Sequence, residues 1–247
     1  MKKELFIREQ YYHHHAYEIL TAHQDIKSFL EKSFTVSIEL TERTKLTKGK
    51  ASEAIKADDL NKEIRRLLSK KKEFKFEVSE EMGVFYFSSK KSSIGGFDFA
   101  LINHEENLIK LRNICFGEIR YNDNIKRWND FLNKNPELKE FADKIITVDN
   151  QGKNIPLFKE LSASPLIVGE IQFGNWALAY RDFFKVLKAN VQNSIDCLVY
   201  IVPTGALEKN LSDGIVTFHK TLKIIKDFEK VINVPIWLVG IDICNSQ

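Results

Sequence analysis

The sequence is poor in cysteine and has no long hydrophobic run. Its three cysteines, Cys115, Cys197 and Cys244, are odd in number and far apart, which argues against a disulfide framework and against a zinc site. Cys197 and Cys244 lie in apolar segments, where cysteine behaves as a small hydrophobic residue. No stretch of about 18 apolar residues occurs, and residues 1–20 hold no apolar signal region. These absences predict a soluble cytoplasmic protein without a membrane partner.

The sequence also lacks internal repeats, low-complexity tracts and a strong excess of one charge. Its 247 residues are 43% hydrophobic, and the net charge is +3 with a pI near 8.6. A mildly basic protein can bind nucleic acid, although this balance alone does not argue for it. The length predicts one domain over residues 1–247, or one domain with an insertion at about 104–155.

Strand and helix patterns alternate in the last third, which predicts an α/β fold. The apolar patterns predict helices at Phe6–Lys32, Leu60–Leu68, Asp123–Lys144 and Val216–Val231, and another after Gly174. We expect the Asp123–Lys144 helix to break near Asn135, because Pro136 follows it. Strands are predicted at Phe34–Leu40, Phe74–Val78, Gly83–Ser88, Phe97–Asn103, Leu108–Arg120, Lys144–Val148, Ile155–Leu161, Leu166–Phe173, Ile195–Val202 and Ile236–Ile241. Ile155–Leu161 and Leu166–Phe173 could form a hairpin.

The stretch Pro165–Lys185 combines a buried strand, two polar side chains and a basic amphipathic helix. Glu170 and Gln172 stand two residues apart, so both point to the same face of the strand. This layout suits a metal-dependent phosphodiesterase, because magnesium held by carboxylates can activate water and stabilise negative charge. Two exposed polar residues at a strand end would give the same short pattern.

The motif V-G-E-I-Q-F-G-N at Val168–Asn175 resembles the core of the type II restriction endonucleases of the BamHI, BglII and BstYI group. The likeness continues through Ile195–Pro203, Asn210–Phe218 and Val234–Ile241. The resemblance implies a restriction-endonuclease-like core, a central mixed sheet flanked by helices. It also implies that Glu170 is catalytic and binds Mg²⁺. Gln172 stands where most relatives have lysine, and an amide cannot be a general base, so Gln172 would position water.

The second metal-binding carboxylate stays open among Asp98, Asp149 and Glu160. Asp98 lies inside an apolar strand after a K-K-S-S-I-G-G segment similar to that of the family, but its use requires a large insertion before Glu170. Asp149 fits if the connection is longer than in the relatives, and Glu160 fits if the turn carries a bulge. Glu118, in the segment G-E-I-R, competes with Glu170 as the strand glutamate.

The same resemblance implies that Asn175, Arg181, Ser212 and Asp213 contact DNA. Asparagine can pair with adenine and aspartate can accept a hydrogen bond from cytosine. Ser212 or Asp213 could equally cap the helix Val216–Val231. Gly214 stands where BamHI carries an arginine, so the resemblance does not imply the sequence specificity of BamHI. The Lys- and Thr-rich segment 41–50 is either a solvated loop or an arm that contacts phosphates.

These observations predict a homodimeric, magnesium-dependent type II restriction endonuclease that cuts a short palindrome in double-stranded DNA. A cognate DNA methyltransferase is expected in the same system, though not as a physical partner. A repair or recombination nuclease with the same core, and an inactive DNA-binding module, are the alternatives.

Overall fold

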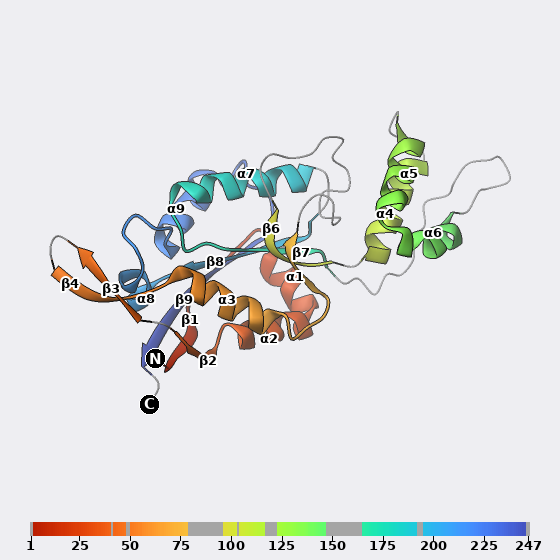
Figure 1. Ribbon diagram of the computed structural model, residues 1–247. Coiled ribbons are helices and arrows are strands. Elements are labelled where there is room, and N and C mark those ends of the chain that lie inside the picture. The colour runs from red at the N-terminus through yellow and green to blue at the C-terminus, as the bar shows by residue number, and fades with distance from the viewer. Residues whose placement is uncertain are drawn as a thin grey trace.

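A seven-stranded mixed sheet forms the centre of the protein, in the order β2-β1-β9-β8-β7-β6-β5 (Figure 1). The computed structural model describes residues 2–40, 42–47, 50–78, 96–102, 104–116, 123–146, 165–191 and 195–245. The strands of the sheet are β1 (Lys2–His13), β2 (Val36–Glu39), β5 (Phe74–Val78), β6 (Phe97–Leu101), β7 (Ile167–Ile171), β8 (Cys197–Pro203) and β9 (Ile236–Asn245). The three central strands β7, β8 and β9 run parallel, and the outer strands pair antiparallel.

Helices cover both faces of this sheet (Figure 1). Helices α1 (Ala16–Ala22), α2 (Gln24–Ser33) and α3 (Ala57–Leu68) pack on one face, and they bury Leu20, Leu30 and Leu60 in its core. Helices α7 (Ala177–Val191) and α9 (Phe218–Asp227) pack on the other face through Phe183 and Ile225. The short helix α8 (Gly205–Asn210) follows β8. β8 is buried along its whole length because both of its faces are covered.

Two further parts extend from the sheet. The antiparallel hairpin of β3 (Glu42–Thr47) and β4 (Lys50–Ile55) projects at one end (Figure 1). Helices α4 (His104–Phe116), α5 (Asn124–Lys134) and α6 (Lys139–Ile145), with the 3₁₀ turn Pro136–Leu138, lie within the predicted insertion. They share a hydrophobic cluster of their own that includes Leu111, Cys115 and Trp128. Among the described residues, no helix is long and apolar enough to cross a bilayer.

The predicted fold class is confirmed, while several element boundaries were wrong. The predicted helix Phe6–Lys32 is a strand as far as His13, because β1 hydrogen-bonds along β9. Leu108–Arg120 was predicted to be a strand, yet residues 104–116 are helical, and Leu108, Leu111 and Cys115 point into one cluster. The predicted break at Asn135 is confirmed.

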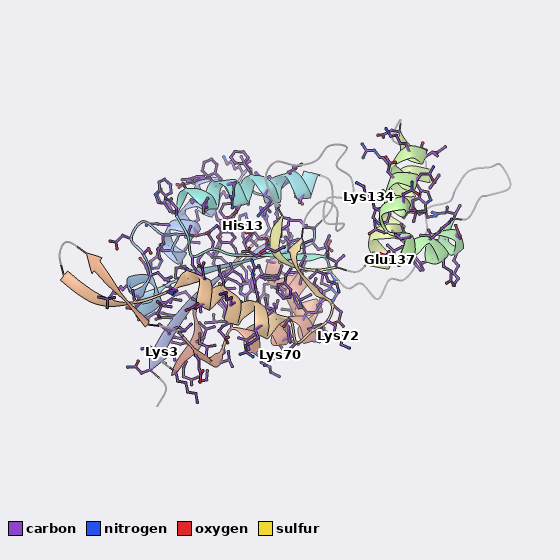
Figure 2. The ribbon with its side chains drawn as sticks, viewed as in Figure 1. Lys3, His13, Lys70, Lys72, Lys134 and Glu137 are labelled. Carbon is purple, nitrogen blue, oxygen red and sulfur yellow. The ribbon has the colours of Figure 1, made fainter. Side chains whose placement is uncertain are left out.

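Other boundaries changed on a smaller scale. Lys144 and Ile145 end α6 instead of starting a strand. Residues 42–47, from the segment 41–50 that was predicted to be a solvated loop or an arm, pair with residues 50–55 as a hairpin. Lys70 and Lys72, in the basic run after α3, are exposed at the surface (Figure 2). The predicted strands Gly83–Ser88 and Ile155–Leu161 lie outside the described residues.

Candidate active site

Strand β6 pairs with β7, and this pairing brings Asp98 to the strand that carries Glu170. The two strands pair through Leu101↔Ile167, Ala100↔Val168 and Phe99↔Gly169. Beyond this point the Asp98 side chain replaces a backbone acceptor, because its Oδ2 accepts a hydrogen bond of 2.7 Å from the backbone N–H of Ile171. The carboxylate of Asp98 therefore lies against the Glu170 segment.

A glycine permits the close approach of these two strands. A Cβ atom added at Gly169 would lie 1.9 Å from the ring of Phe99. Phe99 is fully buried, so its ring has no space into which to move. Packing therefore requires a glycine at position 169, which is also the glycine of the V-G-E-I-Q-F-G-N motif.

Glu170 and Gln172 point to the face covered by α7, as the alternation of the strand predicts. Glu170 is 4% exposed and Gln172 is 8% exposed. Burial raises the pKa of Glu170 well above its usual value, and the negative charges of Asp182 and Asp98 raise it further. The ammonium group of Lys185, which forms an ion pair with Glu170 Oε1, opposes this rise in the pKa.

The pKa of Asp98 is shifted in the same direction as that of Glu170. Burial raises its pKa, while the hydrogen bond from Ile171 and the charge of Arg65 act in the opposite direction. A guanidinium nitrogen of Arg65, on α3, donates to Asp98 Oδ1 at 2.9 Å. The buried carboxylate of Glu170 and the half-buried carboxylate of Asp98 therefore share one region, and each is paired with a cation from a different helix layer.

Gln172 is held by a buried network on α7 and β8. Its Nε2 donates to Asp182 Oδ2 at 2.8 Å, and its Oε1 accepts from the Gly174 N–H at 3.0 Å. The hydroxyl of Tyr200 donates to the same Asp182 oxygen at 3.0 Å. An amide has a second N–H and a second lone pair, so these bonds orient Gln172 and leave it capacity for one more partner on each atom.

The turn after β7 is joined to the loop that precedes α9. Asn175 forms a bridge with Ile215, and the Trp176 N–H donates to the carbonyl of Gly214 at 3.1 Å. The Oδ1 atom of Asn175 also accepts from the Ala177 N–H at 2.9 Å, which fixes the side chain at the start of α7. Asn175 and the Ser212–Asp213 segment therefore lie on one side of the molecule.

The capping explanation for Ser212 and Asp213 is wrong. Helix α9 begins at Phe218, and its N-cap is Thr217, whose side chain accepts from the Lys220 N–H. Ser212 and Asp213 are exposed residues that precede this cap. Arg181 lies on α7 with 54% of its side chain exposed, and its Nη2 atom lies 3.4 Å from Asp182 Oδ1.

The structure does not describe every candidate. Asp149, Glu160 and Glu118 lie outside the described residues. Within the described ranges, no group of three or more histidine, cysteine, aspartate or glutamate side chains is arranged to hold a metal ion.

Sequence reasoning did not assign a role to Asp182, Lys185, Tyr200 or Arg65. One signal was available, because Asp182 and Lys185 fall at the helical spacing of the buried residues Ala179, Val186 and Ala189. Charged residues inside an apolar stripe usually have buried partners. The roles of Arg65 and Tyr200 had no local signal.

Comparison with known proteins identifies the family. The model of the family described as restriction endonuclease BglII/BglIII matches residues 8–241. Among solved structures, restriction endonuclease BglII complexed with a DNA 16-mer has a TM-score of 0.49 and 14% identity, covering 94% of this chain and 76% of that chain. Free BglII has a TM-score of 0.44 and 13% identity, covering 94% and 77%. No curated protein sequence matches. Because the family model spans nearly the whole chain, the protein belongs to the BglII/BglIII family of restriction endonucleases and is a type II enzyme that acts on DNA.

Proposed function

We propose that this endonuclease hydrolyses phosphodiester bonds in both strands of a short palindromic DNA site, with Mg²⁺ as its cofactor. The observation that carries this proposal is the contact between Asp98 and the backbone N–H of Ile171. It brings a second carboxylate to the strand of Glu170 from a segment distant in sequence. Asp98 is therefore our choice for the second metal-binding carboxylate.

The residues present suit a divalent cation, which restriction endonucleases generally use. Magnesium prefers oxygen ligands. The negative charge of Asp98 raises the pKa of Glu170, which means that the two carboxylates repel each other and that a cation near both would be stabilised. Asp98 and Glu170 would hold the ion. When bound, Mg²⁺ lowers the pKa of water and neutralises charge that develops on the phosphate. The second N–H and lone pair of Gln172 would orient the attacking water.

For recognition, we propose that Asn175, Ser212 and Asp213 read base edges and that Arg181 contacts a phosphate. The backbone bridge between residues 175 and 215 supports a shared surface for the first three. Side chains on one surface can enter one groove, where amide and carboxylate groups distinguish bases. An exposed arginine more often meets the phosphate backbone.

We further propose a homodimer, formed through a surface that we call the α7 aromatic surface. It consists of Trp176, Tyr180, Phe184, Phe228 and Val231, whose exposed fractions are 46%, 38%, 67%, 45% and 58%. Trp176, in the turn just before α7, and Tyr180 and Phe184 on α7 are spaced four residues apart, and Tyr180 contacts both Trp176 and Phe228 edge to face. Exposed apolar patches of this kind mark interfaces.

The position of this surface suits a two-fold symmetric enzyme. Helix α7 follows the strand of Glu170 directly. Contact between two copies through α7 would therefore set one site on each side of the two-fold axis, one for each DNA strand. Such an enzyme would act in the cytoplasm, beside a methyltransferase that protects the host's own sites.

The experiment is plasmid cleavage by Glu170→Gln in Mg²⁺, with the exposed Glu18→Gln on the opposite face as the matched control. Discrete bands from the parent and the control support a site-specific enzyme, whereas a smear or no cutting contradicts the proposal. Glu170→Gln should retain DNA binding and lose at least about 100-fold in cleavage, because a charge that stabilises the transition state is removed. Cleavage within tenfold of the parent would remove Glu170 from the mechanism.

A further inference from the structure

Lys185 is a buried lysine in direct contact with the proposed catalytic carboxylate. Only 2% of its surface is exposed. Its Nζ pairs with Glu170 Oε1, donates to the carbonyl of Gly96 at 2.7 Å and lies 4.8 Å from the centre of the Phe97 ring. Fully buried lysines are rare, because an ammonium group loses its hydration on burial. At this position the ion pair with Glu170 offsets part of the lost hydration.

The strand itself offers no cation at this place. Position 172 carries a neutral glutamine, whose amide is bonded to Asp182 and to Gly174. Helix α7 covers the same face of the strand, and Lys185 enters from that helix. Asp182 Oδ1 lies 3.8 Å from its Nζ, so the ammonium stands between two carboxylates.

We propose that Lys185 is a positioning residue for Glu170, and that it supplies from α7 the positive charge absent from strand position 172. Its contacts with Gly96 and Phe97 anchor the ammonium near Asp98, which is two residues from Gly96. The anchored ammonium then fixes the direction of the Glu170 carboxylate relative to Asp98. This inference rests on the proposed function, because it assumes that Glu170 is catalytic.

Loss of this contact should affect metal binding as well as cleavage. Groups that orient metal-binding side chains typically contribute about 10- to 100-fold to metal affinity. Misplacement of a reacting group by about 1 Å can reduce the rate about 100-fold. We therefore expect Lys185→Met, which keeps most of the side-chain volume, to lose on the order of 100-fold in cleavage. It should bind Mn²⁺ at least about tenfold more weakly, while metal-free DNA binding stays unchanged.

The experiment compares the full-length parent, Lys185→Met, Lys185→Arg, Glu170→Gln and the double variant of Lys185→Met with Glu170→Gln. Cleavage, Mn²⁺ affinity by calorimetry and thermal unfolding are measured for each. Lys185→Arg should recover part of the cleavage rate and metal affinity. The double variant should cleave no more slowly than Glu170→Gln alone, because Lys185 acts through Glu170. It should also melt higher than Lys185→Met, since the latter leaves a buried carboxylate without its partner.

The outcomes separate this inference from the proposed function. If Glu170→Gln cuts normally, the catalytic assignment of Glu170 is wrong, and this inference fails with it. If Glu170→Gln is inactive while Lys185→Met cuts within threefold of the parent, only the inference about Lys185 is overturned. Purely additive losses of rate and stability in the double variant would also overturn it, because they would mean that Lys185 only supports the helix. If Lys185→Met does not fold, Lys185→Arg and the double variant decide the question by the same comparisons.

Discussion

Replacement of Asp182 should destabilise the protein more than any surface substitution, because two buried donors share one of its oxygens. Asp182 is fully buried. Gln172 Nε2 donates to Oδ2 at 2.8 Å, and the Tyr200 hydroxyl donates to the same atom at 3.0 Å. Asp182→Ala leaves both groups buried without that acceptor, and it removes a negative charge beside Lys185.

The magnitude follows from these contacts. A buried polar group left unsatisfied costs about 1–3 kcal/mol, so the two donors together should cost about 4 kcal/mol. A loss of 1 kcal/mol lowers Tm by about 2–4 °C in a protein of this size, so we expect Asp182→Ala to melt roughly 8–16 °C below the parent. Asp182→Asn is the matched control, since an amide oxygen can accept both bonds. Asp182→Asn should lower the free energy of unfolding by less than half as much as Asp182→Ala does.

Differential scanning calorimetry of the parent and the two variants at pH 7.5 measures these shifts. The reasoning is refuted if Asp182→Ala lowers Tm by less than about 3 °C, which corresponds to roughly 1 kcal/mol. It is also refuted if the alanine and asparagine variants melt together, because the loss would then come from charge and not from the unsatisfied donors.

Four further predictions concern individual residues. Thr217→Ala should cost about 1 kcal/mol of stability by loss of a helix cap, whereas Asp213→Ala should lower the ratio of specific to non-specific DNA binding, measured by competition binding. Burial raises the pKa of Cys197 to about 12, so a thiol reagent at pH 8 should label the exposed Cys244 in the native protein and spare Cys197 until unfolding. Burial lowers the pKa of His13 from 6.5, so the unfolded state binds more protons. The free energy of unfolding should therefore fall as the pH drops below about 6.5. In His13→Gln, the free energy of unfolding measured by urea denaturation should depend less steeply on pH.

The sequence was most informative where the chain is buried on both sides or amphipathic. The apolar runs of β8 and β9 predict central strands, and the stripe of α7 predicts a helix, because burial demands those patterns locally. The alternation of Glu170 and Gln172 placed both side chains on one face. In contrast, β1 was predicted to be helical because its strand character comes from pairing with β9, at the other end of the chain.

The candidate site depends on contacts that no local pattern encodes. Asp98 meets Ile171 across 73 positions, and Arg65 meets Asp98 across 33. The sequence could name Asp98 as one of three candidates, but the choice among them needs the pairing of β6 with β7. Residues 147–164, which include Asp149 and Glu160, lie outside the described structure, so those two candidates stay predictions.

Charge balance explains why a strand motif alone describes only part of this site. The strand contributes one carboxylate and a neutral amide, and the neighbouring strand contributes the second carboxylate. Buried charges are stable only when they are paired. The paired cations come from helices on opposite faces of the sheet: Arg65 on α3 binds Asp98, and Lys185 on α7 binds Glu170. Because the ammonium group comes from α7, position 172 does not need to carry a positive charge. The amide of Gln172, which donates to Asp182 beside Tyr200, can therefore occupy this position.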